Sequence, residues 1–445
     1  MKFDRNRIAL LPALLVIASF ALVSCGGGGP SLATPPSKVT TRVLASQSAS
    51  SPTAFPGLIL IDGEIDTLVR AAEIGAGSSP GLMAISPNRT LVSAFDSLSN
   101  SAVVINTQKE TTPGAIPLGG STTSMVALDT GFGYAAVPAA SFQTGPPPGA
   151  IVVMNLTAGG VTALISVPNA QTIVSSPDGS QLLVFNNSNS VTVMSPLLVN
   201  TGSPVTVTVS GFDSPVYGVF SEDGSTAYIL NCGAQCGGTQ ASVQVLNMRT
   251  TPPMIVGAAI PVNGATIGFL PQSSSTLYVA GKGTPTGPLC ASITNAAPTA
   301  AQYCGTLDLV DLTTLSDPYY NNPAAEIAIT DGYHDRIDMS TNGQLFIGAY
   351  GCTNIGDVNN VQGEVRGCLS IFNTTNAKVV IPPDNGDVTG LQGFTTRDVE
   401  YVVEGGKLRV YDTLIDALIP PNDFIETGTI LITGYFIDVK AIDFF

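Results

Sequence analysis

The feature that most constrains the fold is a unit of about fifty residues that returns along most of the chain. Each unit holds a short apolar strand, a tight polar turn, a second apolar strand, a third strand that in most units ends in Asn or Asp, and a fourth strand, such as residues 205–209. In one unit the turn is Ser176-Pro177-Asp178-Gly179, where proline presets φ and glycine tolerates a positive φ. The first strands begin near residues 82, 124, 171, 216, 265, 335, 391 and 437. The third strands are found at residues 103–106, 152–155, 191–194, 243–247, 307–311, 369–373 and 408–412.

Four short strands per repeat of this length predict an all-β fold, a β-propeller of four-stranded blades. A β-sandwich is the alternative, but sandwiches lack a sustained period. Seven complete units run from about residue 78 to 434. Outside them, residues 58–62 and 68–74 are predicted as third and fourth strands, and residues 437–444 as a first strand. Pairing these N- and C-terminal strands in one blade would close the ring and remove exposed sheet edges, so eight blades are favoured. Seven blades remain possible if the N-terminal strands pair as extras.

The turn and the strands around it resemble a known repeat. An S-P-D-G turn, an apolar strand, a loop and a strand of the pattern V-x-V-hydrophobic-Asn/Asp are similar to the YVTN-type propeller repeat, over nearly all of residues 57–445. That family includes secreted and surface proteins and lactonase-like propellers. The resemblance therefore implies a propeller, and it implies hydrolysis at the channel mouth as a possible activity. No lactonase set of His, Glu and Arg aligns residue by residue, so the resemblance assigns no catalytic role.

The N-terminus has the features of an export signal. Three basic residues within the first seven precede an apolar run at residues 8–23, which is short for a membrane-spanning helix. The run ends in Leu22-Val23-Ser24-Cys25, which resembles a bacterial lipobox, so residues 1–24 are predicted to be a lipoprotein signal peptide. An ordinary secretory signal with an incidental Cys25 is the alternative. Acylation of Cys25, for example with palmitate, would anchor the chain to a membrane.

The predicted domain organisation follows from this signal. Residues 25–54 hold the lipidated cysteine and a Gly/Ser/Pro-rich flexible tether, and residues 55–445 form the propeller. The expected location is the bacterial cell envelope, facing the periplasm or the cell exterior.

Six further cysteines fall in pairs between predicted second and third strands. An exported chain meets an oxidising compartment, and the strand topology favours a disulfide within each loop. The predicted pairs are Cys232 with Cys236, Cys290 with Cys304, and Cys352 with Cys368.

Strand direction sorts the loops onto two faces. Strands alternate in direction within a blade. The loops that join second to third strands therefore lie on the same face as the connections between blades, and the S-P-D-G turns lie on the opposite face. The long loops at residues 138–149, 231–241, 282–306 and 351–367 therefore gather on one face. Long ordered loops commonly carry function, and disulfides reduce the entropy that they lose on binding. This long-loop face is the predicted recognition surface.

Composition excludes several functions. The net charge of −15 and pI of about 4.3 would repel phosphate backbones, so nucleic acid is not an expected partner. With one His in the chain, a His-cluster metal site is excluded and a Ser-His-Asp device has little support.

Two clusters are candidates for chemistry. His334, Asp335 and Arg336 are predicted near the channel on the long-loop face, where they could bind an anion or move protons; a structural role in the turn between blades is the alternative. In the loop between Cys352 and Cys368, the oxygens of Asp357, Asn359 and Glu364 could bind calcium, but their spacing does not match an EF-hand and a solvated acidic loop is the competing interpretation.

These observations predict a lipid-anchored extracytoplasmic binding or scaffolding module. Its partner would be a protein or small-molecule ligand at the long-loop face, and no cofactor is predicted. A lactonase-like hydrolase and a component of an envelope or secretion assembly are the alternatives. Catalytic side chains are scarce, which favours binding over enzymatic activity.

Overall fold

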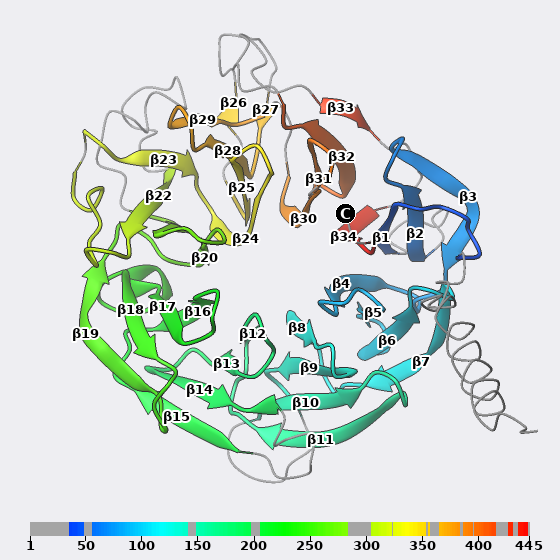
Figure 1. Cartoon of the computed structure of the whole chain (residues 1–445), viewed down its shortest axis with the longest axis horizontal. Helices are drawn as coiled ribbons and strands as arrows, with labels where there is room; N and C mark the ends of the chain where they lie inside the picture. Colours follow the sequence, from blue (N-terminus) through cyan, green and yellow to red (C-terminus); the bar gives the residue numbers. More distant parts are fainter. Residues whose placement is uncertain are drawn as a thin grey trace, which may run out of the picture.

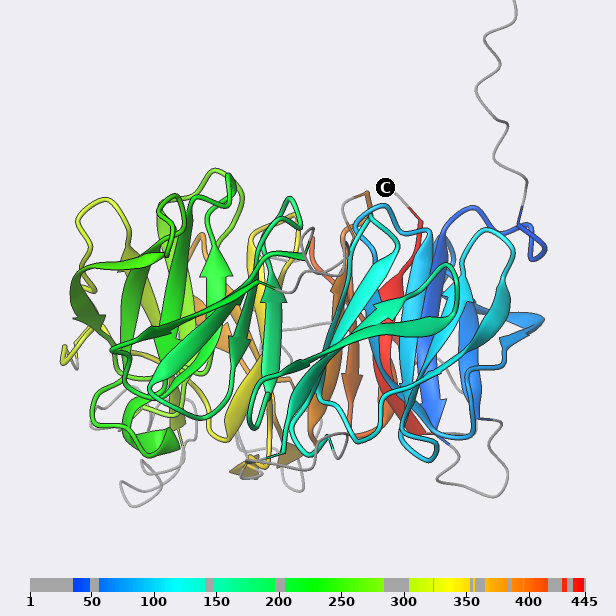
Figure 2. The ribbon, with the colours of Figure 1, turned by 90° about the horizontal axis from the view of Figure 1, so that it is seen from below.

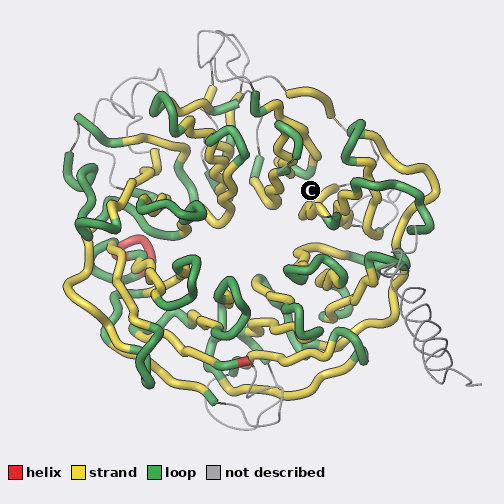
Figure 3. Tube along the Cα trace, in the orientation of Figure 1, coloured by secondary structure: helices red, strands yellow, loops and turns green. Residues whose placement is uncertain are grey.

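The computed structural model describes residues 35–48, 56–140, 148–196, 205–283, 304–322, 324–352, 355–356, 365–382, 386–394, 396–414, 426–429 and 435–443. Eight antiparallel sheets of four strands stand around a central axis, so the chain is an eight-bladed β-propeller, as the repeat predicts (Figure 1). The innermost strands of neighbouring blades contact one another around the ring. Figure 3 shows the same ring as a trace, with strands in yellow.

Seven blades are continuous in sequence. Blade 1 consists of β4 (Pro80–Ile85), β5 (Leu91–Asp96), β6 (Ser101–Asn106) and β7 (Thr111–Pro117), and blade 2 of β8 (Ser124–Ala127), β9 (Phe132–Val137), β10 (Ala150–Asn155) and β11 (Gly160–Ser166). Blade 3 consists of β12 (Thr172–Ser175), β13 (Leu182–Phe185), β14 (Ser190–Met194) and β15 (Thr206–Ser210), and blade 4 of β16 (Pro215–Phe220), β17 (Thr226–Asn231), β18 (Ser242–Asn247) and β19 (Met254–Pro261). Blade 5 consists of β20 (Ile267–Phe269), β21 (Thr276–Gly281), β22 (Cys304–Asp311) and β23 (Ile327–Thr330). Blade 6 consists of β24 (Tyr333–Met339), β25 (Gln344–Tyr350), β28 (Leu369–Asn373) and β29 (Lys378–Val380). Blade 7 consists of β30 (Val388–Gly393), β31 (Val399–Glu404), β32 (Lys407–Asp412) and β33 (Glu426–Thr429). Two loops hold extra elements: the 3-10 helix η1 (Gly233–Cys236), and the hairpin of β26 (Ile355–Gly356) and β27 (Val365–Arg366).

Blade 8 joins the two ends of the chain. From the channel outward its strands are β34 (Tyr435–Ala441), β1 (Arg42–Ser48), β2 (Gly57–Asp62) and β3 (Thr67–Ile74). The predicted closure by terminal strands is therefore confirmed.

The second strand of blade 8 corrects the predicted tether. Residues 25–54 were expected to be flexible, but Arg42–Ser48 form β1, hydrogen-bonded between β34 and β2. The reason lies in burial on both faces of the sheet: Val43 and Leu44 are fully buried, and so is Ser46. A strand buried on both sides need not alternate apolar and polar residues, so the usual strand pattern was missing.

Apolar side chains fill the spaces between blades. For example, Tyr134 and Ile151 of blade 2 pack with Ile173 and Val184 of blade 3 in one buried cluster. Each blade thus contributes side chains to two interfaces, and the ring is stable only when every interface is filled.

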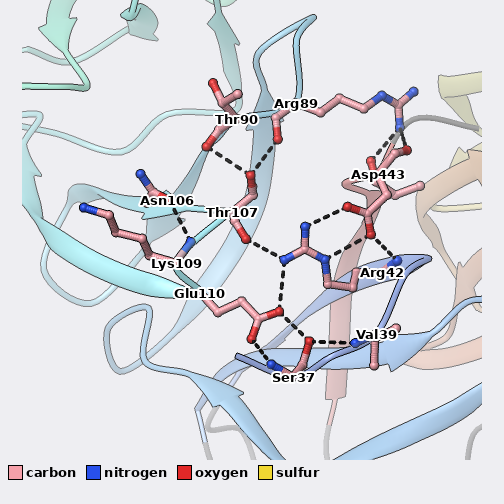
Figure 4. Close-up of polar contacts among 11 residues, drawn as sticks. Ser37, Val39, Arg42, Arg89, Thr90, Asn106, Thr107, Lys109, Glu110 and Asp443 are labelled. Carbon is pink, nitrogen blue, oxygen red and sulfur yellow. Dashed lines mark hydrogen bonds and ion pairs between the residues drawn. The ribbon is translucent and has the colours of Figure 1, made fainter. Parts of the chain in front are cut away.

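A buried ion-pair cluster holds blade 8 against blade 1 (Figure 4). Arg42 Nη1 donates to Glu110 Oε1 at 2.9 Å, and Arg42 Nη2 donates to Asp443 Oδ1 at 2.7 Å. Ser37 N also donates to Glu110 Oε2 at 2.8 Å. The N-terminal segment, the β6–β7 turn and the C-terminal end are thereby joined at one point.

The two faces of the ring differ, as strand direction predicts. The S-P-D-G turns and the β6–β7 turn lie on one face, and the connections that contain η1 and β26–β27 leave from the other, which is the lower one in Figure 2. Because Ser37 and Asp443 both reach the Arg42 cluster, the described chain begins and ends on the S-P-D-G face. The long-loop face points in the opposite direction. No helix in the described ranges is long and apolar enough to cross a membrane.

Candidate functional site

The central channel opens into a cavity of about 840 Å³ on the long-loop side. First strands of six blades line it: β4, β8, β12, β16, β20 and β24. The rim also includes Asn187, two residues after the end of β13, and Tyr350, the last residue of β25. This is the kind of concave, mixed surface that binds small molecules in proteins.

Disulfide-stapled loops border this cavity. Cys236, which lines the cavity, is bonded to Cys232, and Cys352, bonded to Cys368, follows Tyr350 by two residues. Two of the three predicted disulfides are thus present. Cys304 is also disulfide-bonded, but Cys290 lies outside the described residues, as does Cys25.

The two sides of the cavity differ in chemistry. Blades 2 to 5 contribute a mixture of small polar and apolar side chains, such as Thr172, Val174 and Tyr217. Blade 6 contributes two tyrosines and an ion pair, which consists of Asp335 and Arg336 at 3.0 Å. A bound molecule would meet an uncharged, mixed surface on one side and a charged, aromatic surface on the other.

The guanidinium of Arg336 is held in place by its neighbours. Its Nε donates to the backbone oxygen of Thr389 at 2.8 Å, and its Nη1 donates to Asp335 Oδ2 and to the Asp335 backbone oxygen. Burial raises the pKa of Asp335, and the charge of Arg336 opposes that rise. The pair is therefore oriented before any ligand arrives.

His334 lies away from the cavity. Its side chain is fully buried between β24 and blade 5, with Nε2 2.9 Å from the backbone oxygen of Thr330. The ring packs on Gly305, where a Cβ would lie 2.6 Å from His334 Cε1. Burial lowers the pKa of His334 to about 4, partly offset by the Thr330 hydrogen bond, so the imidazole is neutral at neutral pH. The structure thus brings Asp335 and Arg336 to the cavity and separates His334 from it.

A bulge explains this separation. The pairing of β24 with β25 shifts register between His334 and Arg336, so two residues of β24 oppose one of β25. A bulge interrupts the alternation of side chains along a strand, and the three neighbouring residues do not form one group.

One buried carboxyl group, that of Glu400, was not found from the sequence; it lies close to Asp338 on β24. Glu400 on β31 is fully buried, and among the described residues neither carboxyl oxygen has a hydrogen-bond partner. Burial raises its pKa well above the usual range, and the charge of Asp338 raises it further. Both groups lie beside Gly393, where a Cβ would be 2.7 Å from Glu400 Oε2 and 3.5 Å from Asp338 Oδ2. The only signal in the sequence is a glutamate within the apolar strand at residues 399–403.

A second, smaller cavity of about 490 Å³ lies toward the S-P-D-G face, lined by residues such as Phe220 and Asp178. Val174, Ser175 and Tyr217 line both cavities.

The predicted calcium ligands Asp357, Asn359 and Glu364 lie outside the described residues. Within the part of the chain that the structure describes, no group of three or more His, Cys, Asp or Glu side chains is arranged to hold a metal ion.

Comparison with known proteins supports the fold. No protein-family model matches the chain, and no curated protein sequence matches it. Among solved structures, the chain is similar to the dihydro-heme d1 dehydrogenase NirN in complex with DHE, with a TM-score of 0.62, 11% identity and coverage of 91% of this chain and 75% of that one. It is also similar to a eukaryotic initiation factor, with a TM-score of 0.51, 10% identity and coverage of 91% and 99%. The periplasmic gluconolactonase PpgL of Pseudomonas aeruginosa aligns at a TM-score of 0.46 and 12% identity over 90% of this chain and 98% of that one. At such identities the likeness shows the propeller fold alone.

Proposed function

We propose that this chain is an extracytoplasmic binding protein, anchored through acylated Cys25, that takes a small molecule into the cavity on its long-loop face. The observation that carries the proposal is the position of the 840 Å³ cavity, between a stapled loop at Cys236 and the rim residue Tyr350. The disulfides support an oxidising compartment, since such bonds are rare in the reducing cytosol.

The direction of the chain also fits an anchored receptor. The described chain begins on the S-P-D-G face, where Ser37 contacts Glu110. A membrane anchor on that side would leave the cavity facing away from the lipid, open to molecules that diffuse in.

The position of His334 disfavours a histidine-based lactonase mechanism in this cavity. A general base must lie within hydrogen-bond reach of the reacting group. His334 is fully buried beside Thr330 and Gly305, outside the residues that line the cavity.

The test is a thermal-shift screen of the purified full chain against a panel of small organic cations, anions and neutral amphiphiles. A hit should lose its effect in Thr172→Trp, which fills the cavity from β12. Thr208→Trp on the exposed outer strand β15 is the matched control and should leave the effect intact. Shortening the loop between Cys352 and Cys368 should also weaken binding while the fold survives. If the compounds raise the melting temperature of both tryptophan variants equally, the cavity is not the binding site.

A further inference from the structure

Two tyrosines form an aromatic platform at the rim of the cavity. Tyr333 begins β24 and Tyr350 ends β25, and the two are register partners with ring centroids 5.3 Å apart and planes inclined by 36°. Both line the cavity, and Tyr350 remains 46% exposed. The face of an aromatic ring carries negative partial charge and attracts cations.

Carboxylates surround this platform. Asp335 lies next to Tyr333 in the cavity lining, and its Oδ1 has no hydrogen-bond partner among the described residues. Asp387 is exposed, and its Oδ1 accepts a hydrogen bond of 2.8 Å from the backbone nitrogen of Gly351, the residue after Tyr350. Two acidic groups therefore lie near the rings, one in the cavity lining and one exposed beside the residue that follows Tyr350.

The local field is negative where the rings lie. Burial raises the pKa of Tyr333 to about 12, with further contributions from Tyr350 and from the charge of Asp335. Burial also raises the pKa of Tyr350; the charges of Asp335 and Asp387 add to the rise, and the charge of Arg336 opposes it. The carboxylate contributions to these rises favour a cation at the same place, whereas desolvation, the largest cause, does not distinguish the sign of a charge. The whole chain, at −15, attracts cations from a distance.

Arg336 is the positively charged residue in the cavity lining, and its charge is already compensated. Asp335 accepts from its Nη1 at 3.0 Å, and the carbonyl of Thr389 accepts from its Nε. Its Nη2 has no acceptor among the described residues, so a ligand oxygen could still bind there. An anion at that nitrogen would lie close to Asp335 and within an acidic protein, and would be repelled by both.

We propose that the cavity binds an organic cation, with an ammonium or quaternary ammonium group over Tyr350 and the rest of the molecule along the uncharged side at Thr172 and Val174. This inference rests on the proposed small-molecule site and adds the chemical class of its ligand.

The experiment uses three probes of similar shape: benzyltrimethylammonium, its neutral carbon isostere neopentylbenzene, and benzoate. Titration calorimetry on the full chain should show the cation binding at least about tenfold more tightly than either other probe, and more weakly as salt is raised. Tyr350→Ala should weaken cation binding about tenfold or more, whereas Tyr350→Phe, which keeps the ring, should retain it. Asp387→Asn should weaken it less, because that group is exposed.

The matched control is Tyr435→Ala, which removes a tyrosine of similar exposure, 41%, from blade 8. It should leave cation binding unchanged. Tighter binding of benzoate or of the neutral probe, or equal losses in Tyr350→Ala and Tyr435→Ala, would overturn the assignment of a cation.

Failure of this inference is distinguishable from failure of the proposed function. If benzoate or the neutral probe binds and Thr172→Trp abolishes that binding, the cavity is a ligand site of another class. If a probe binds and Thr172→Trp does not affect it, the cavity itself is the wrong site.

Discussion

The buried ion-pair cluster at the seam between blades 8 and 1 should contribute strongly to stability. Arg42 lies between Glu110 and Asp443, and the exposed fractions of the three side chains are 6%, 7% and 18%. Arg42→Met keeps much of the apolar stem but leaves two carboxylates without their cation. Removing one partner of a buried pair typically costs about 3–5 kcal/mol, because the remaining charge stays uncompensated.

The assay is urea unfolding of the full chain at neutral pH, followed by circular dichroism. A matched control is Arg249→Met: Arg249 pairs with Asp223 at 2.9 Å, the same distance as Arg42 to Glu110, but its side chain is 72% exposed. The control should lose little, because solvent screens exposed pairs. Equal shifts of the unfolding midpoint in the two variants would refute the reasoning that burial makes the Arg42 cluster important.

Three further predictions concern buried and covalently modified groups. The pKa of His334 is about 4 in the folded chain and about 6.5 in the unfolded chain, so the unfolded chain takes up a proton first as the pH falls. Lowering the pH from 7.5 to 4 should therefore reduce the free energy of unfolding by about 3 kcal/mol, because each pH unit between the two pKa values contributes about 1.4 kcal/mol. The variant His334→Gln should not show that loss. The pKa of Glu400 is higher in the folded chain than in the unfolded chain. As the pH rises above about 4.5, Glu400 therefore loses its proton in the unfolded chain first, and the free energy of unfolding falls. Glu400→Gln should therefore raise the unfolding midpoint at pH 8 and leave it unchanged near pH 4, and equal effects at both pH values would contradict burial as the cause. Non-reducing peptide mapping should recover a Cys290–Cys304 disulfide, and a different partner for either cysteine would disprove this pairing. Fatty-acid labelling should mark the wild-type chain but not Cys25→Ala, and equal labelling of the two would disprove acylation at Cys25.

Much of the fold follows from the period of the sequence. Turns such as Ser176-Pro177-Asp178-Gly179 recur with a spacing that only a closed array of four-stranded blades explains, and strand direction then assigns the long loops to one face. Strand β1 was missed because Arg42–Ser48 is buried on both sides and follows a Gly/Ser/Pro-rich stretch. Its role depends on β34, almost four hundred residues away in sequence.

The site was less accessible to sequence reasoning. Of the motif at His334, Asp335 and Arg336, the last two residues line the cavity and His334 does not, and the bulge that separates His334 from them has no sequence pattern of its own. The pairing of Tyr333 with Tyr350 and the proximity of Glu400 to Asp338 arise from strand register and blade packing. Such contacts between distant residues follow from the three-dimensional arrangement and not from local spacing.

The most direct test of the proposed binding role is a crystal structure of the full chain with the tightest-binding compound of the screen. The account predicts density for that compound in the cavity between Tyr350 and Thr172, on the long-loop side of Tyr217. Density confined to the smaller cavity near Phe220, or to the outer strands of the blades, would contradict it.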